Sequence, residues 1–295
     1  MEKFIFLIIS MAAATMGACS GINKYNNTIY DSVEIVNGKV VNATPKGEIG
    51  KMTTKSYKLD SEISRITNYT LADIEFFTGP ARMEVTAPEN LIDNLKILEK
   101  GPTLTLRSDN LTDAKIKIWL PTLDEITLKG VGDFSAGLLK SNRLNINLEG
   151  VGDVNIERIQ TPLLTTNAAG TGDININKVE TPNAQFIMVG TSDLNIKEVE
   201  AIVLKLKCQG VGKIDISSVE GNQIDLLLQG TGDAYLNNID IQSLRIVLPG
   251  VGNAKVSGKS GSAIVNLSGL GTIDISKLKC DNVSKKVNGL GNIVE

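Results

Sequence analysis

The residues best suited to chemistry in this sequence are carboxylates that recur at a regular spacing. An aspartate closes a short glycine-containing motif at Asp133, Asp153, Asp173 and Asp193. If the copies stack at the roughly 4.8 Å spacing of paired strands, their charges repel unless solvent or cations neutralise them. Carboxylate and carbonyl oxygens are ligands that Ca²⁺ prefers, so a calcium ladder is one interpretation.

The other interpretation of these aspartates is structural, because Asp and Asn side chains accept hydrogen bonds from backbone N–H groups at turns. Later copies of the motif hold Lys213, Asn253 and Thr272 at this position, none of which brings a carboxylate. Calcium-binding β-rolls have a period of about nine residues and more oxygen ligands per turn. We therefore favour the structural role, expect no metal or other cofactor, and keep the calcium ladder as an alternative.

The motif that carries these aspartates repeats along most of the chain. Its first glycine occurs at positions 130, 150, 170, 190, 210, 230, 250, 269 and 289, so the period is 20 residues with one step of 19. Such a period is typical of stacked repeat architectures. Glycine-rich loops that bind phosphate precede a helix, whereas a strand pattern follows every copy here. The glycines are better explained as crowded corners with positive φ, and they are Gly130, Gly132, Gly150, Gly152, Gly170, Gly172, Gly190, Gly210, Gly212, Gly230, Gly232, Gly250, Gly252, Gly269 and Gly271.

Between the corners, apolar and polar residues alternate as in strands with one buried face. In one repeat the inward positions are Leu144, Ile146 and Leu148 before the corner and Val154, Ile156 and Ile159 after it. We predict an all-β, single-chain parallel β-helix (β-solenoid) with coils of about 20 residues, each with two main strands and a shorter third side. The usual crossover chirality favours right-handed winding. A leucine-rich repeat does not fit, since its Leu-x-x-Leu-x-Leu frame does not recur.

The start of the chain predicts export and membrane attachment. Residues 1–18 have a basic start and a short apolar run, as in a signal peptide. Met16-Gly17-Ala18-Cys19 resembles a bacterial lipobox, in which the cysteine becomes the lipidated N-terminus. We therefore expect a lipid anchor at Cys19 and a place in the cell envelope, as an outer-membrane lipoprotein that faces either the periplasm or the exterior.

Three further segments follow the anchor. Residues 19–55 are polar and predict a tether, with a hairpin over residues 33–41 around Asn37-Gly38. Residues 56–128 are β-rich but not periodic, which predicts an irregular N-terminal cap and entry coils. Residues 129–295 carry the regular β-helix repeats.

Composition and charge exclude several classes of function. The sequence contains no histidine, which removes Ser-His-Asp and Cys-His nucleophile systems and all His-ligated metal sites. The formal net charge of −3 is spread along the chain without a basic stripe, so we expect no nucleic-acid partner.

A polysaccharide lyase is the natural enzyme alternative, because many β-helices act on carbohydrates. Such enzymes build their clefts from long loops, and the regular period leaves no room for an inserted loop after Gly130. Exposed aromatic residues that could stack on sugars are nearly absent from the repeats, with Tyr235 the main one. We therefore predict that the protein is not an enzyme.

The segment before the repeats resembles the opening of the head GIN domain family. The residues concerned are Ile74–Phe77, Val85–Leu91, Gly101–Leu104 and Ile116–Pro121, followed by corners such as Gly150-Val151-Gly152-Asp153. Many members carry Ser at the third corner position, where this chain mostly has Gly. Members are described as auto-transporter adhesins, common among exported proteins of Bacteroides and relatives. The resemblance implies a solenoid fold and an envelope location.

Together these patterns predict a non-catalytic cell-envelope lipoprotein that acts as an adhesin or binding scaffold through its outer faces. The outward polar positions Asn155, Asn175, Asn195 and Asp215 offer a flat face to a glycan or protein ligand, or are simply solvated. The alternative is a carbohydrate-binding or lyase-like envelope protein that uses the corner aspartates, with calcium. The incomplete last coil over 292–295 suggests a homodimer.

Overall fold

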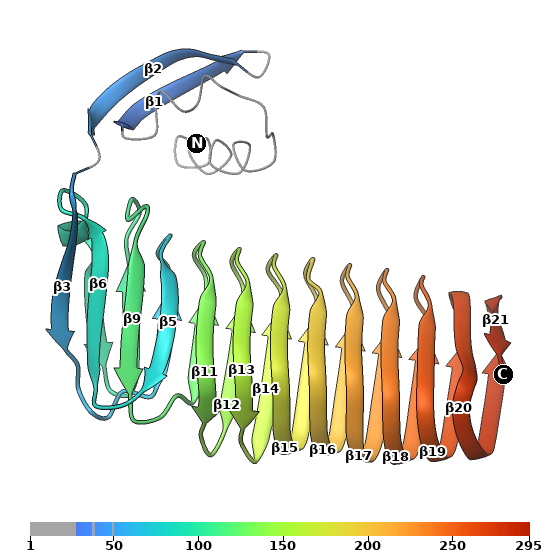
Figure 1. Cartoon of the computed structure of the whole chain (residues 1–295). Coiled ribbons are helices and arrows are strands. Elements are labelled where there is room, and N and C mark those ends of the chain that lie inside the picture. The colour runs from blue at the N-terminus through green and yellow to red at the C-terminus, as the bar shows by residue number, and fades with distance from the viewer. Residues whose placement is uncertain (1–27, 37–38, 49) are drawn as a thin grey trace.

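The structure, a computed structural model, describes residues 28–36, 39–48 and 50–295. The strands from β3 onward form one continuous 19-stranded sheet that winds into a rod (Figure 1). Equivalent residues of neighbouring coils pair in parallel at an offset of one repeat, as in Ile174 with Leu194 and Met188 with Cys208. The predicted all-β parallel β-solenoid with coils of about 20 residues is therefore confirmed.

Two strands lie in the segment predicted to be a tether. β1 (Thr28–Val36) and β2 (Lys39–Glu48) pair antiparallel, with Val36 opposite Lys39. The paired strands extend beyond the hairpin predicted over residues 33–41 on both sides. The predicted signal peptide, Cys19 and the Asn37-Gly38 turn lie outside the described residues.

The N-terminal cap begins with a coil of the solenoid itself. β4 (Arg65–Asn68) and β5 (Asp73–Thr78) both pair in parallel with the first coil of the regular repeats. On their other side β4 pairs with β8 (Thr103–Arg107) and β5 pairs with β9 (Lys115–Leu120). The coil that comes first in the sequence therefore lies between two coils that come later.

Antiparallel strands close the N-terminal end of the rod. β6 (Arg82–Pro88) pairs with β9, and β3 (Met52–Lys58) pairs with β6. On the opposite side β7 (Lys96–Lys100) pairs with β8, and a short 3-10 turn, η2 (Ile92–Asn94), precedes β7. Reversing the strand direction in this way covers the apolar end of the stack.

The regular coils continue this sheet to the C-terminal end. From β15 onward a single bent strand runs from one glycine corner to the next, where separate strands were predicted. The bends of neighbouring coils lie over one another, so the parallel hydrogen-bond ladder continues around them. The strands are β10 (Glu125–Leu128), β11 (Phe134–Lys140), β12 (Leu144–Leu148), β13 (Val154–Gln160), β14 (Leu163–Ala168), β15 (Ile174–Met188), β16 (Leu194–Cys208), β17 (Ile214–Leu228), β18 (Ala234–Leu248), β19 (Ala254–Leu267), β20 (Leu270–Val287) and β21 (Leu290–Val294).

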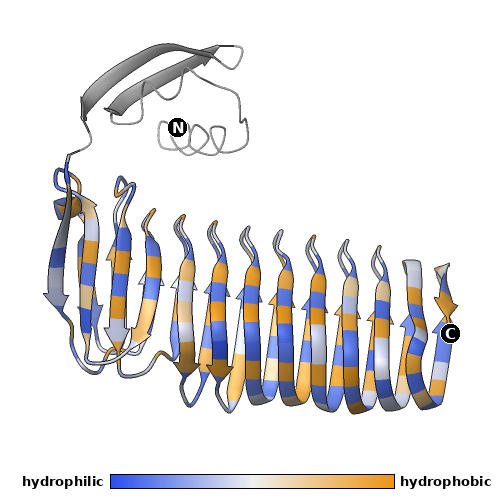
Figure 2. Cartoon of the chain, in the orientation of Figure 1, coloured by the Kyte–Doolittle hydropathy of each residue, from blue (hydrophilic) through white to orange (hydrophobic). Residues whose placement is uncertain are grey.

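The core is a stack of aliphatic layers inside the rod. Apolar and polar residues alternate along each strand, which Figure 2 shows as alternating bands. The inward positions predicted from the sequence are buried in most coils, including Leu144, Ile146, Val154, Ile156 and Ile159, whereas Val283 and Val287 in the last coil are exposed. Since each layer repeats the one before, slim aliphatic residues fill most of it, and the large buried rings Phe134 and Phe186 are exceptions.

The two glycines of each corner meet different constraints. A Cβ on the first glycine, as at Gly170, would lie 2.1 Å from the carbonyl oxygen of Gly150 in the preceding coil. The second glycine, as at Gly172, has φ +139°, and a Cβ there would lie 2.1 Å from the carbonyl oxygen of Gly152. Stacked backbone carbonyls therefore crowd out a side chain at both positions of these glycine corners, whereas the corner at Gly190 holds a buried Ser192 at the second position.

We predict that Gly172→Ala destabilises the rod by about 2–3 kcal/mol, because the added methyl group overlaps backbone that cannot move independently. The measurement is the midpoint of urea unfolding. Gly137→Ala is the matched control, since a Cβ there meets no atom within 4 Å. That variant should keep its midpoint or gain about 0.5 kcal/mol. Equal losses in the two variants would contradict the corner argument.

Candidate functional site

The corner aspartates form a ladder of side-chain-to-backbone hydrogen bonds along the rod. The N–H groups of Asp153 and Asp173 each donate to the Oδ1 atom of the aspartate one coil earlier, at 2.8 Å. The N–H groups of Asp193 and Lys213 donate in the same way at 3.2 and 2.7 Å. Each carboxylate from Asp133 to Asp193 therefore links its own coil to the next.

The ladder extends beyond the aspartates that the repeat motif identified. Asp73 Oδ1 accepts the N–H of Asp133 at 3.0 Å, and Asn253 Oδ1 accepts the N–H of Thr272 at 3.1 Å. Asp73 was missed because Leu71-Ala72 stands where the other corners have the motif. Since the amide of Asn253 makes the same bond, the ladder requires an acceptor oxygen and not a charge.

No metal site is built from clustered ligands in the described residues. Among them, no group of three or more His, Cys, Asp or Glu side chains has an arrangement that could hold a metal ion. The Oδ1 atoms of Asp133, Asp153, Asp173 and Asp193 already accept backbone hydrogen bonds. The structural role accounts for their positions without a cation.

A second ladder, of amide side chains, lies on the outer face of the sheet. Asn175 Nδ2 donates to Asn155 Oδ1 at 3.1 Å, and Asn195 Nδ2 donates to Asn175 Oδ1 at 3.0 Å. Asp215, next in this column, instead accepts from Lys213 Nζ at 3.2 Å. The predicted polar face is therefore a set of side chains held in line by their neighbours.

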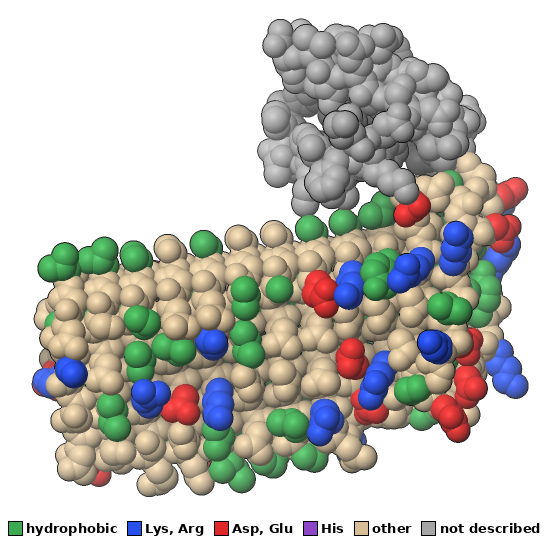
Figure 3. All heavy atoms as spheres, turned by 180° about the vertical axis from the view of Figure 1, so that it is seen from behind, with side chains coloured by type: hydrophobic (Ala, Val, Ile, Leu, Met, Phe, Trp, Pro, Cys, Tyr) green, Lys and Arg blue, Asp and Glu red, His purple; other side chains and the backbone are tan. Residues whose placement is uncertain are grey.

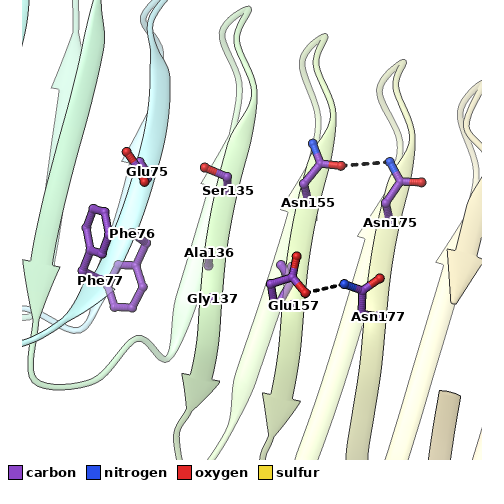
Figure 4. A pocket seen from close by; sticks show the side chains of 11 residues that line it. Glu75, Phe76, Phe77, Ser135, Ala136, Gly137, Asn155, Glu157, Asn175 and Asn177 are labelled. Carbon is purple, nitrogen blue, oxygen red and sulfur yellow. Dashed lines mark hydrogen bonds between the residues drawn. The ribbon is translucent and has the colours of Figure 1, made fainter. Parts of the chain in front are cut away.

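A shallow depression interrupts this face where the cap meets the repeats (Figure 4). Its volume is about 300 Å³, and residues from β5, β11, β13 and β15 line it. Gly137 contributes no side chain and Ser135 only a short one, while Phe77, Asn155 and Glu157 stand on the flanking strands. The depression is thus the gap left by small residues on β11.

Aromatic residues border this depression on the cap side. The Phe77 and Trp119 rings stack with centroids 5.0 Å apart and planes inclined by 15°. The Arg82 guanidinium lies 3.8 Å from the centroid of Trp119. The repeat pattern points to Tyr235 and not to this pair, because Phe77 and Trp119 come from cap strands that only the sheet brings together.

An apolar edge runs along the glycine corners, visible as a row of hydrophobic side chains at one edge of the rod in Figure 3. Val211 and Val251 in this row are 55% and 49% exposed. Isolated bridges join the middle residues of successive corners, namely Val131, Val151, Thr171, Thr191, Val211, Thr231, Val251 and Leu270. The side chains of these middle residues point to solvent, because the corner positions on either side of them are packed against the backbone of a neighbouring coil.

An ion-pair network crosses three coils beside the third side of the solenoid. Arg158 donates to both carboxylate oxygens of Glu180, at 2.6 and 2.7 Å, and Gln160 donates to it at 2.7 Å. The hydrogen bonds from Arg158, and to a smaller extent the one from Gln160, lower the pKa of Glu180 to about 2. Lys178 contacts Glu180, Glu198 and Glu200.

The family model for the putative auto-transporter adhesin, head GIN domain, matches residues 64–220 and 203–294. The chain belongs to this head GIN domain family. Its family matches begin in the cap and continue almost to the last residue, so the solenoid described above is the head GIN fold in this chain.

Solved structures resemble this head GIN domain in fold. A putative adhesin from Parabacteroides distasonis is 20% identical, with a TM-score of 0.54, and the match covers 83% of this chain and 97% of that one. A putative adhesin from Parabacteroides merdae is also 20% identical, with a TM-score of 0.53 and coverage of 83% and 97%. A putative lipid binding protein from Parabacteroides distasonis is 21% identical, with a TM-score of 0.55 and coverage of 83% and 98%.

No curated protein matches the chain. Within residues 28–36, 39–48 and 50–295, no helix is both long and apolar enough to cross a bilayer.

We predict that Asp173→Asn leaves stability nearly unchanged, whereas Asp173→Ala costs about 1 kcal/mol, because only alanine removes the acceptor for the Asp193 N–H. Thermal unfolding of both variants, with Ca²⁺ and with chelator, measures the difference. Wild-type melting curves should coincide in the two conditions. A Ca²⁺-dependent midpoint that Asp173→Asn abolishes would instead establish the calcium ladder.

We predict that Glu180→Gln destabilises the protein at neutral pH by less than about 1 kcal/mol, since the ion pair with Arg158 is solvent-exposed. A carboxylate with a lowered pKa stabilises the fold above its ordinary pKa of 4.5 and loses that contribution as pH falls toward 2. The stability difference between wild type and variant should therefore vanish between these two values in pH-dependent urea unfolding. A difference that persists at pH 2 would contradict the assignment.

Proposed function

We propose that this protein is a non-catalytic adhesin of the bacterial cell envelope, which binds its partner through the outer face of the solenoid. The family and the solved relatives called putative adhesins support the general role. The observation that carries the proposal is the repetitive outer face, on which the Asn155–Asn175–Asn195 ladder holds polar groups in line.

Such a face suits adhesion for a physical reason. The side chains are already ordered by hydrogen bonds along the rod, so a partner that binds them costs little additional side-chain entropy. Repetition at the strand spacing also allows an extended or repetitive partner to make several equivalent contacts. Strength then comes from many weak contacts and not from one deep cleft.

The proposal of a binding protein, and not an enzyme, follows from the site chemistry. The sequence has no histidine to serve as a general base. The corner carboxylates lie in one row along the rod and accept backbone hydrogen bonds from the next coil. They do not converge from opposite sides on a common point, as paired acid and base groups must.

A lipid on Cys19 would hold the rod at the outer membrane, with the segment to residue 55 as a spacer. In this arrangement adhesion depends on both the anchor and the face. The two contributions can be separated by substitution.

The test compares bacteria that lack the chain with bacteria that express it whole, on immobilised glycans and host-matrix proteins. We expect chain-dependent attachment, and at least tenfold weaker attachment with Cys19→Ser, because the unanchored protein leaves the cell surface. Equal attachment with and without the chain would refute the adhesin role. Release of new reducing ends from a polysaccharide by the purified chain would refute the non-catalytic role.

A further inference from the structure

The geometry points to a carbohydrate-binding site in the depression around Gly137, which takes a neutral oligosaccharide. This inference deepens the proposed adhesin function and rests on it. The site is distinct from the corner aspartates, which lie in another column of the coil.

The first element of the site is the ring of Phe77. Trp119 on β9 stacks on one side of this ring, whereas β11 with Gly137 lies on the opposite side of β5. Because Gly137 has no side chain, space stays open beside Phe77 on the β11 side (Figure 4), and Lys117 Nζ lies 5.9 Å from the centroid of the Phe77 ring. The flat, apolar ring of Phe77 beside this gap can stack against the C–H face of a sugar ring.

The second element is a set of polar groups at the other side of the gap. Asn155 accepts from Asn175 through Oδ1, so its Nδ2 group is turned away from that neighbour. In the described part of the chain, no protein acceptor binds this Nδ2 group. Glu157 accepts from Asn177 through Oε2, which leaves Oε1 as a second acceptor. The Asn155 Nδ2 donor, the Glu157 Oε1 acceptor and the Ser135 hydroxyl can together bind sugar hydroxyl groups, which both donate and accept hydrogen bonds.

These polar groups are held in position before any ligand arrives. Asn155 is the first member of the amide ladder, and the bond from Asn175 fixes the direction of its amide. Glu157 is fixed by Asn177 in the neighbouring column. Preorganised groups of this kind raise affinity by lowering the entropy that binding costs.

Charge in the depression selects among sugars. The ionisable residues that line it are Glu75 and Glu157, and Lys117 Nζ lies 3.5 Å from Glu75 outside the lining. Lys117 pairs with Glu75, so the charge of Glu157 leaves the depression negative. Like-charge repulsion therefore disfavours uronates and sulfated glycans. A neutral oligosaccharide is therefore the expected occupant.

The size of the site limits what it can bind. A volume of about 300 Å³ is at the lower end of ligand pockets and is open to solvent. It can hold about one sugar ring, with the adjoining residues of an oligosaccharide lying along the amide ladder. Affinity for a single chain should be weak, and attachment of a cell would rely on many copies.

The experiment uses the full chain, purified in detergent, and measures binding to neutral hexasaccharides of glucose, mannose, galactose and xylose, with hexagalacturonate as the acidic probe. Gly137→Phe places a ring in the depression, and the Cβ of that side chain meets no atom within 4 Å. Ser217→Phe is the matched control, since Ser217 is exposed in the same column of a later coil. Phe77→Ala removes the ring.

We expect at least one neutral hexasaccharide to bind wild type and Ser217→Phe equally, and to bind Gly137→Phe and Phe77→Ala at least tenfold more weakly. Hexagalacturonate should bind more weakly than that neutral probe. The inference is overturned if no neutral probe binds, if hexagalacturonate binds best, or if Gly137→Phe binds as wild type does. Unchanged melting midpoints show that the variants are folded.

The same variants separate this site from the adhesin role in the attachment assay. If Gly137→Phe cells attach like wild type while cells without the chain do not, the carbohydrate site is refuted and the adhesin function stands. If Gly137→Phe cells lose attachment and Ser217→Phe cells keep it, the depression is the site that the adhesin uses.

Discussion

The close stacking of one backbone corner on the next is the constraint on which the rest of this structure depends. At the corner glycines a backbone carbonyl of one coil lies so near the glycine of the next coil that even a methyl group would overlap it. This contact holds the coils in a single register, because a slip by one residue would bring a side chain into the corner. Parallel pairing then repeats along all sides of the rod.

Once the register is set, identical side chains must lie over one another. Aliphatic residues then fill the interior in layers, and polar residues form the Asp and Asn ladders. In the Asp ladder, stacking like charges at the strand spacing is unfavourable by itself. The structure offsets this repulsion because each carboxylate accepts a backbone N–H, and because Lys213, Asn253 and Thr272 interrupt the run of charges.

Regular repetition gives a flat surface, so distinctive sites arise where repetition is broken. The junction of cap and repeats is such a place, because β9 and β6 supply Trp119 and Arg82 from outside the repeat pattern. Gly137 on β11 adds a gap that later coils fill with Glu157 and Asn177.

The period of the glycine motif and the alternation between its copies were sufficient to predict the solenoid, its coil length and its buried columns. These features are local and repeated, and each coil contacts mainly its neighbours, so sequence distance maps directly onto distance along the rod. The cap did not follow this rule. β4 and β5 precede β8 and β9 in the sequence but lie between them and the repeats. Only the tertiary structure therefore revealed Asp73 as the start of the carboxylate ladder and the stacking of Phe77 on Trp119, because those contacts join strands that no periodic pattern relates.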